Sequence, residues 1–96
     1  MMTVVATFSI QPGKEADFER FFAELAAQVR ASEKGCVLYA LNRSRADGSA
    51  YVVVERYADN AALALHSQSP HFQEAFPKFG NFLAGPPRIE MFDEVG

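Results

Sequence analysis

The chain has 96 residues, of which 49% are hydrophobic and 22% are charged. This length supports one hydrophobic core, so a single domain over residues 1–96 is predicted, and the apolar share excludes a disordered chain. The net charge is −3 and the nine basic residues are scattered, so nothing in the sequence could follow a nucleic-acid backbone.

Membrane, export and metal-binding classes are also disfavoured. The longest apolar runs are far shorter than a membrane span, and the first ten residues lack the basic start of a signal peptide. The single cysteine, Cys36, and two histidines can form neither an internal disulfide nor a four-ligand zinc site. We therefore expect a cytoplasmic protein without a metal, in which Cys36 is buried and inert.

The first half of the chain predicts a strand, a helix and two further strands. Residues 3–10 alternate between apolar and mixed positions, as in a strand with one buried face. Residues 14–32 carry apolar side chains at helical spacing, and Gly35 follows as a stop. Residues 36–45 and 50–57 alternate again, and the Ala-Asp-Gly sequence between them is typical of a hairpin turn.

The second half begins with two short helices. Asp59 or Asn60 is a suitable cap for the first, which should end just before Ser69. Ser69 and Pro70 then suit the cap and the first position of the second helix. Pro77 should break or kink this second helix, because it lacks the backbone N–H that a helix needs.

A last strand at residues 88–95 gives the order β-α-β-β-α-β. That order predicts an α+β, ferredoxin-like fold, in which a four-stranded antiparallel sheet carries its helices on one face. The other face keeps apolar side chains from residues 36–45 and 50–57. Because a second copy of the chain could cover that face, a homodimer is predicted.

The residues able to carry chemistry gather between Tyr51 and Phe72. Glu55 lies within a strand, either as a surface ion pair with an arginine or as a partly buried carboxylate that orients a histidine or a ligand hydroxyl. His66 falls near a helix end, where it could simply pack on the sheet. His71 falls in a first helical turn, where the neutral ring is favoured, as a base or as a surface residue. For each histidine, a catalytic role and a purely structural role both stay open.

The nine phenylalanines predict an aromatic core. Some of them, with Phe79 among them, could also line an apolar pocket between the sheet and the helices, and such a pocket suits a planar aromatic ligand. The candidate ligand-contacting residues come from this pocket and from the strand that carries Glu55: Phe8, Tyr51, Tyr57, Phe72 and Phe76.

Several short motifs resemble those of the antibiotic biosynthesis monooxygenase family. The most specific are Glu55-Arg56-Tyr57, Asp59, Ala62-Leu63, His66 and Ser69-Pro70-His71-Phe72. Pro12-Gly13-Lys14, Glu33-Lys34-Gly35-Cys36 and Gly85-Pro86 also match. The resemblance implies a dimeric α+β barrel that oxidises a small aromatic quinol or phenol with O2, without metal, haem or flavin. It further implies that His66 or His71 is the base, that Glu55 orients this base or holds a substrate hydroxyl, and that Phe8, Phe72 and Phe76 stack on the ring.

Other branches of the family suggest alternatives. The haem-degrading pattern expects Asn, Trp and His near Ala6, His66 and Phe76, and all three differ here. An isomerase of a small carbonyl signal molecule could use the same Glu and His groups, and Ser69-Pro70-His71 resembles that branch too. A dimer that binds a ligand without catalysis is the third possibility. A pocket lined by phenylalanine favours the oxygenase, and a ring of charged groups would favour the isomerase.

Overall fold

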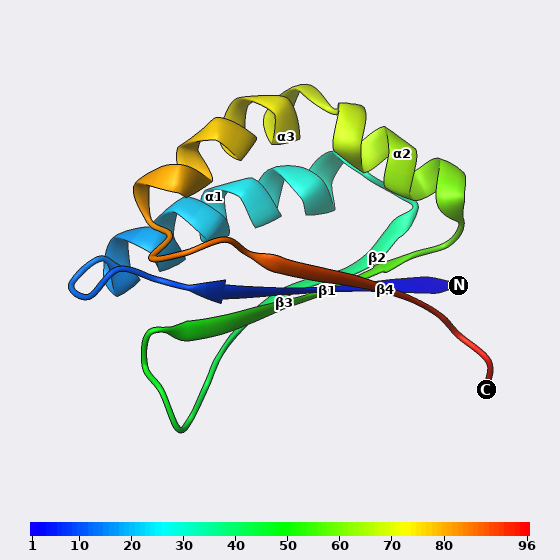
Figure 1. Ribbon diagram of the computed structural model, residues 1–96. Coiled ribbons are helices and arrows are strands. Elements are labelled where there is room, and N and C mark those ends of the chain that lie inside the picture. Colours follow the sequence, from blue (N-terminus) through cyan, green and yellow to red (C-terminus); the bar gives the residue numbers. More distant parts are fainter.

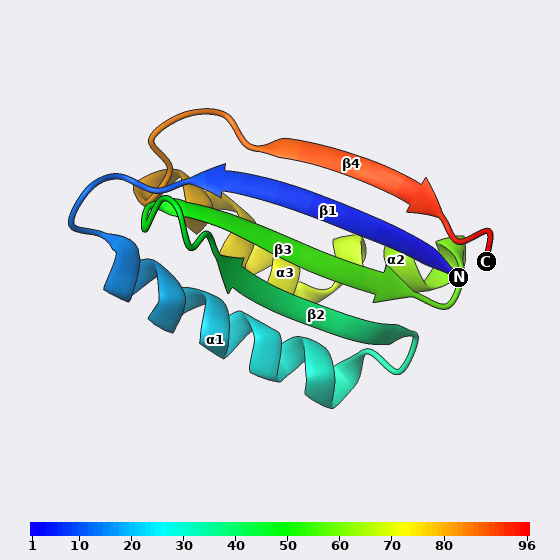
Figure 2. The same ribbon diagram turned by 90° about the horizontal axis from the view of Figure 1, so that it is seen from below.

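Four antiparallel strands form one sheet, and all helices lie against one of its faces (Figure 1). This computed structural model describes residues 1–96. The strands are β1 (Met2–Ser9), β2 (Cys36–Arg43), β3 (Ala50–Tyr57) and β4 (Arg88–Asp93). Their spatial order is β2-β3-β1-β4, which places β4 at one edge beside β1 (Figure 2). The predicted α+β, ferredoxin-like class is therefore confirmed, with the last strand ending two residues earlier than expected.

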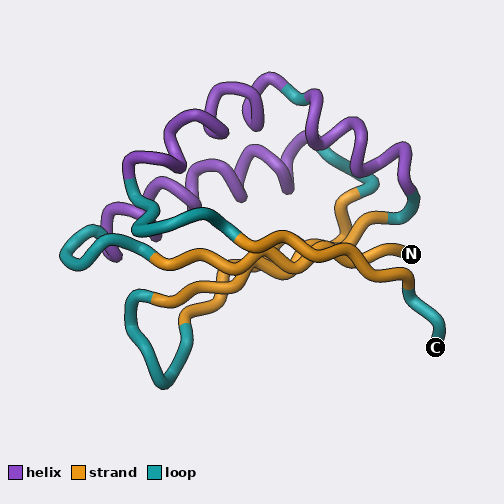
Figure 3. The backbone as a smooth tube through the Cα atoms, viewed as in Figure 1, coloured by secondary structure: helices purple, strands orange, loops and turns teal.

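The helical layer consists of α1 (Glu15–Ser32), α2 (Asn60–Gln68), α3 (Pro70–Ala75) and the 3₁₀ helix η1 (Phe76–Asn81) (Figure 3). Asp59 is the cap of α2, because its carboxylate accepts a 2.8 Å hydrogen bond from the Ala62 backbone N–H. The Ser69 hydroxyl accepts in the same way from Phe72 at the start of α3. The predicted interruption also occurs, since α3 gives way to η1 immediately before Pro77.

The core lies between the helices and the sheet face that they cover. Strand β3 buries every second side chain on that face, Tyr51, Val53, Glu55 and Tyr57, as its alternation predicts. Glu55 is thus carried into the interior by the strand period itself. The opposing helix α1 contributes side chains that are almost completely shielded from solvent, such as Phe18. This packing explains most of the aromatic content.

Cys36 lies at the start of β2, next to a bulge in the pairing with β3. The thiol is half-buried rather than fully buried as predicted, and its Sγ donates to the Leu38 carbonyl at 3.4 Å. Burial, with the nearby Glu33 carboxylate as a second cause, raises the pKa of the Cys36 thiol to about 11. The thiol therefore stays protonated at neutral pH, which supports the expectation of an inert cysteine.

The helix-free face of the sheet retains apolar side chains. Val5, Val52 and Val54 are half-buried there, and Leu38 is 40% exposed. Phe92 on the edge strand β4 belongs to the same face, because it pairs with Thr3, and it is 49% exposed. None of the helices is both long enough and apolar enough to cross a membrane.

Candidate active site

An apolar cavity of about 360 Å³ lies between the sheet and the segment formed by α3 and η1. Ten of its fourteen lining residues are hydrophobic. The lining comprises Ala6, Phe8, Phe22, Tyr39, Val53, Glu55, Phe72, Phe76, Pro77, Phe79, Gly80, Leu83, Pro87 and Ile89. Three of the five predicted ligand-contacting residues, Phe8, Phe72 and Phe76, are therefore in the wall of one cavity, as is Phe79.

Glu55 is the one charged residue in this lining, and only 9% of its surface is exposed. Burial raises the pKa of the Glu55 carboxyl, and the negative charge of Glu33 adds to this rise. A 2.6 Å hydrogen bond donated by the Tyr57 hydroxyl acts in the opposite direction, as a positive charge on His66 does when that ring is protonated. The Glu55 carboxylate therefore takes up a proton more readily than an exposed glutamate, and it does so inside an apolar cavity.

The interpretation of Glu55 as a surface ion pair is wrong. The arginine beside it, Arg56, is directed to the other face of the sheet and pairs with Glu94 at 3.0 Å. The Arg43 guanidinium pairs with Glu19 at 3.2 Å. Strand alternation places Arg56 on the opposite face from Glu55, and Arg43 pairs with Tyr51, four residues along β3 from Glu55.

His66 is buried behind the cavity wall, with 3% of its surface exposed. Its ring centroid lies 4.6 Å from that of Phe72, 5.2 Å from that of Tyr39 and 5.5 Å from that of Tyr57. Phe72 and Tyr39 line the cavity, and Tyr57 donates its hydroxyl hydrogen to Glu55. His66 therefore touches the cavity wall from behind without lining the cavity.

One carboxylate, Glu33, joins the two histidines. The Nδ1 atom of His66 lies 3.0 Å from both Glu33 oxygens, and the Nε2 atom of His71 lies 2.5 Å from Oε2. The Glu33 side chain is only 8% exposed. Although these residue types bind metals in many proteins, no group of three or more is arranged to hold a metal ion here.

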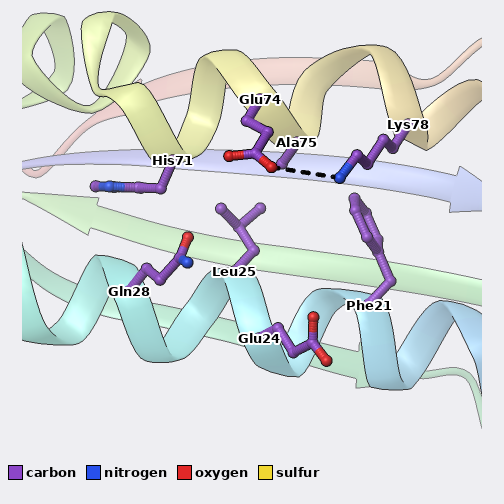
Figure 4. Close-up of a pocket in the computed structure, with 8 residues that line it drawn as sticks. All are labelled: Phe21, Glu24, Leu25, Gln28, His71, Glu74, Ala75 and Lys78. Atoms are coloured by element: carbon purple, nitrogen blue, oxygen red, sulfur yellow. Dashed lines mark ion pairs between the residues drawn. The ribbon is translucent and has the colours of Figure 1, made fainter.

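His71 faces the outer side of the helical layer. It lines a pocket of about 100 Å³ between α1 and α3, where Glu24 and Gln28 project from the opposite helix (Figure 4). It also lines, together with Glu33, an outer concavity of about 730 Å³ beside the end of α1. The structure thus places Glu55 in the cavity wall and His66 behind that wall, and it leaves His71 outside the cavity.

Two predicted ligand-contacting tyrosines do not line the cavity. The Tyr51 hydroxyl donates to Glu19 at 2.6 Å, towards the outer part of α1. Tyr57 lies beneath Glu55 and is completely buried. Tyr57 can therefore act on a bound ligand only through Glu55.

Sequence reasoning missed Tyr39 and Glu33. Tyr39 belongs to the strand predicted at residues 36–45, whose alternation alone does not reveal the pocket. Glu33 carries one local signal: it is the C-cap of α1, at the negative end of the helix dipole. An acidic residue at that end requires compensation, and the two histidines provide it.

The family model for antibiotic biosynthesis monooxygenases matches residues 1–78. A crystal structure from Caulobacter crescentus CB15, described as a candidate antibiotic biosynthesis monooxygenase, superposes with a TM-score of 0.94. That protein is 43% identical to this one, and the match covers 99% of this chain and 90% of that chain.

Two further relatives extend the comparison. A Mycobacterium tuberculosis protein named as a candidate monooxygenase, Rv0793, is 33% identical over 90 residues, which are 94% of this chain and 87% of Rv0793. An uncharacterized Synechocystis protein is 25% identical over 91 residues, or 95% of this chain, and the match spans 61% of its own greater length. The motifs, the fold and the similarity over nearly the whole chain agree, and the chain belongs to the antibiotic biosynthesis monooxygenase family.

Proposed function

We propose that the chain is a cofactor-independent monooxygenase that oxidises a small aromatic quinol or phenol with O2. One observation carries this proposal: an aromatic cavity of about 360 Å³ contains a single charged group, the buried Glu55 carboxylate. Aromatic walls suit a planar ring, and an isolated carboxylate suits its hydroxyl. The family membership supports monooxygenase chemistry in this cavity.

The proposed reaction balances without an added reductant. A ring that carries a hydroxyl group loses that proton and passes an electron to O2, after which the two radicals combine at a ring carbon. The C–H bond at that carbon and the O–O bond then break, which leaves one oxygen atom on the ring as a carbonyl and releases the other, with the ring hydrogen as one of its two hydrogens, as water. The substrate supplies all four electrons, and the proton taken from it returns to the departing oxygen.

The cavity residues divide this work between them. The substrate ring stacks on Phe8, Phe72 and Phe76. The Glu55 carboxylate accepts a hydrogen bond, and then the proton, from the substrate hydroxyl. His66 stands directly behind Phe72, so it is better placed than His71 to take the proton onward from Glu55. The ten hydrophobic lining residues offer water few hydrogen-bonding partners, so a bound aromatic ring should displace it from the cavity.

The composition of the lining supports oxygenase rather than isomerase chemistry. Isomerisation of a small polar carbonyl compound requires several polar groups that hold its oxygens. The Glu55 carboxylate and the Tyr39 hydroxyl are the only polar side-chain groups of the fourteen residues that line the cavity. This composition favours an aromatic substrate and therefore the oxygenase.

Oxygen uptake with a reduced naphthoquinone tests the proposed function. With metals chelated, the protein should accelerate O2 consumption, and ¹⁸O2 should place one labelled atom in the hydroxylated quinone and one in water. Heat-denatured protein at the same concentration controls for autoxidation of the quinol. Uptake equal to that control, or a product without label, would contradict the proposal.

We also propose that the chain acts as a homodimer joined through the helix-free face of its sheet. The exposed Leu38 and Phe92 and the buried, unpartnered Nε of Arg56 support this, because a second chain would cover the apolar groups and could supply an acceptor. Sedimentation equilibrium should give twice the mass of one chain, and Leu38→Asp should shift the mass towards one chain. A wild-type monomer at all concentrations would refute the dimer.

A further inference from the structure

His66 lies between the apolar cavity and the outer concavity. On its inner side, Tyr39 and Phe72 form part of the cavity wall that also contains Glu55. On its outer side, its Nδ1 contacts Glu33, which lines the outer concavity. The imidazole is thus the partition between the proposed substrate cavity and the protein surface, and one buried carboxylate holds it there.

We propose that Glu33 is a positioning residue for the proposed oxygenation: it holds the Nδ1 hydrogen of His66 and leaves Nε2 free to take up and return the substrate proton. The inference rests on the proposed function, and no sequence motif assigned a role to Glu33. Its basis is geometric, since both oxygens of a shielded carboxylate lie 3.0 Å from the same ring nitrogen.

The tautomer follows from the chemistry of the contact. An ionised carboxylate only accepts hydrogen bonds, so a ring nitrogen that bonds to it must carry the hydrogen. A neutral imidazole has one such nitrogen, and Nδ1 of His66 is therefore the donor. Nε2 is then the basic atom of His66, and no hydrogen bond occupies it.

Glu33 also stabilises the state in which the substrate proton is held. When Nε2 accepts the proton, His66 becomes an imidazolium in the interior, with only 3% of its surface exposed. The charge of Glu33 compensates this cation at hydrogen-bond distance, as a carboxylate does for the histidine of a Ser-His-Asp triad. The proton can then return through Glu55 when the O–O bond breaks, so that none is lost to solvent.

The chain fixes Glu33 from three sides. Glu33 is the C-cap of α1, while α2 carries His66 and α3 carries His71. Ser69 joins the two short helices, and its hydroxyl donates to the His66 carbonyl at 2.8 Å. His71 then donates to Glu33 from the surface, so that its role is to hold the carboxylate in place rather than to contact substrate.

Kinetics with the quinol test the positioning role. Glu33→Gln keeps the shape but removes the charge, and it should lower kcat about 100-fold. KM should change little, because Glu33 does not line the cavity. Glu33→Asp keeps the charge and should retain more activity than Glu33→Gln. The matched control is Glu24→Gln, an exposed carboxylate on the same helix in the pocket beside His71, which should leave both constants unchanged.

A second measurement requires no turnover. Nitrogen NMR of the neutral imidazoles should show His66 with a hydrogen on Nδ1 and a bare Nε2, with the signals assigned from His71→Asn, which leaves His66 as the only histidine. The opposite tautomer would overturn the inference even if no quinol were oxidised. A wild-type kcat for Glu33→Gln, in a protein that does oxidise the quinol, would overturn it while leaving the proposed function intact.

Discussion

Replacing Glu55 by Gln should reduce oxygenation of the quinol at least about 100-fold while the protein remains folded. Glu55 is the one charged side chain in the lining of the apolar cavity, and no other lining residue can accept and hold a substrate proton as a carboxylate. Gln keeps the size of the side chain and an oxygen for the Tyr57 hydroxyl, so the loss would report the charge. Oxygen uptake under saturating quinol measures it.

The pH dependence of the wild-type rate should also report the ionisation of Glu55. Burial raises the pKa of Glu55 above the ordinary value of 4.5, and the proposed reaction needs the ionised form. The rate should therefore rise with pH through this raised pKa.

As the pH rises, the free energy of unfolding should fall while the rate of oxygenation rises. Because the folded pKa of Glu55 lies above its unfolded value, folding favours the protonated carboxyl, and stability falls as pH rises from the unfolded pKa to the folded one. Below both values the carboxyl is protonated in either state and this penalty is absent. Glu55→Gln should thus melt at a higher temperature than the wild type at pH 7, and the difference should shrink near pH 4.

Glu19→Gln is the matched control for Glu55→Gln. Glu19 also accepts a 2.6 Å hydrogen bond from a tyrosine hydroxyl, that of Tyr51, but its side chain is 44% exposed and lies outside the cavity. Loss of this carboxylate should leave oxygen uptake close to the wild-type rate. If Glu55→Gln were as active as Glu19→Gln, the role proposed for the cavity carboxylate would be wrong.

The elements that sequence patterns predicted are those set by local chemistry. The period of two in β3 predicted that Tyr51, Glu55 and Tyr57 share a face, and the helices confirm this by covering that face. The caps at Asp59 and Ser69 depend on hydrogen bonds within three residues, so a short sequence window contains all of the information. The same locality explains why the helix break at Pro77 was predictable.

The arrangement of the candidate site depends on packing between distant segments. Glu33 contacts His66 and His71, which lie 33 and 38 residues further along the chain, and no periodicity links them. The sequence placed both histidines beside Glu55, but it could not show that α3 turns His71 to the outer side. The acidic cap of α1 was the one local sign that Glu33 needed partners.

Gly35→Ala should destabilise the fold by about 1–3 kcal/mol, because the new methyl group has no room. A Cβ atom on Gly35 would lie 2.5 Å from the Ala62 Cβ and 3.5 Å from the Ala62 Cα. The first contact is too short for two carbon atoms, and Ala62 sits in the first turn of α2, where its backbone is held by the Asp59 cap. Denaturant unfolding measures the loss.

The comparison with Gly48→Ala isolates the steric cause. No atom lies within 4 Å of a Cβ built on Gly48, so this variant should unfold at nearly the wild-type denaturant concentration. In the double variant Gly35→Ala with Ala62→Gly the clash is removed. The double variant should therefore lose less free energy of unfolding than the two single variants lose together. The Gly at position 62 itself costs about 1 kcal/mol, because glycine is unfavourable in a helix. Additive single effects would contradict the steric explanation.

The Gly35 variant should also disturb the candidate site. Gly35 follows Glu33 by two residues, and Ala62 precedes His66 by about one turn of α2. Relief of the clash requires α2 to move away from the end of α1, which would lengthen the contact between Glu33 and His66. Oxygenation should therefore fall in Gly35→Ala, even where the protein is still folded, and should recover in the double variant. Recovery of stability without recovery of rate would show that the close approach of Gly35 to Ala62 serves the fold alone.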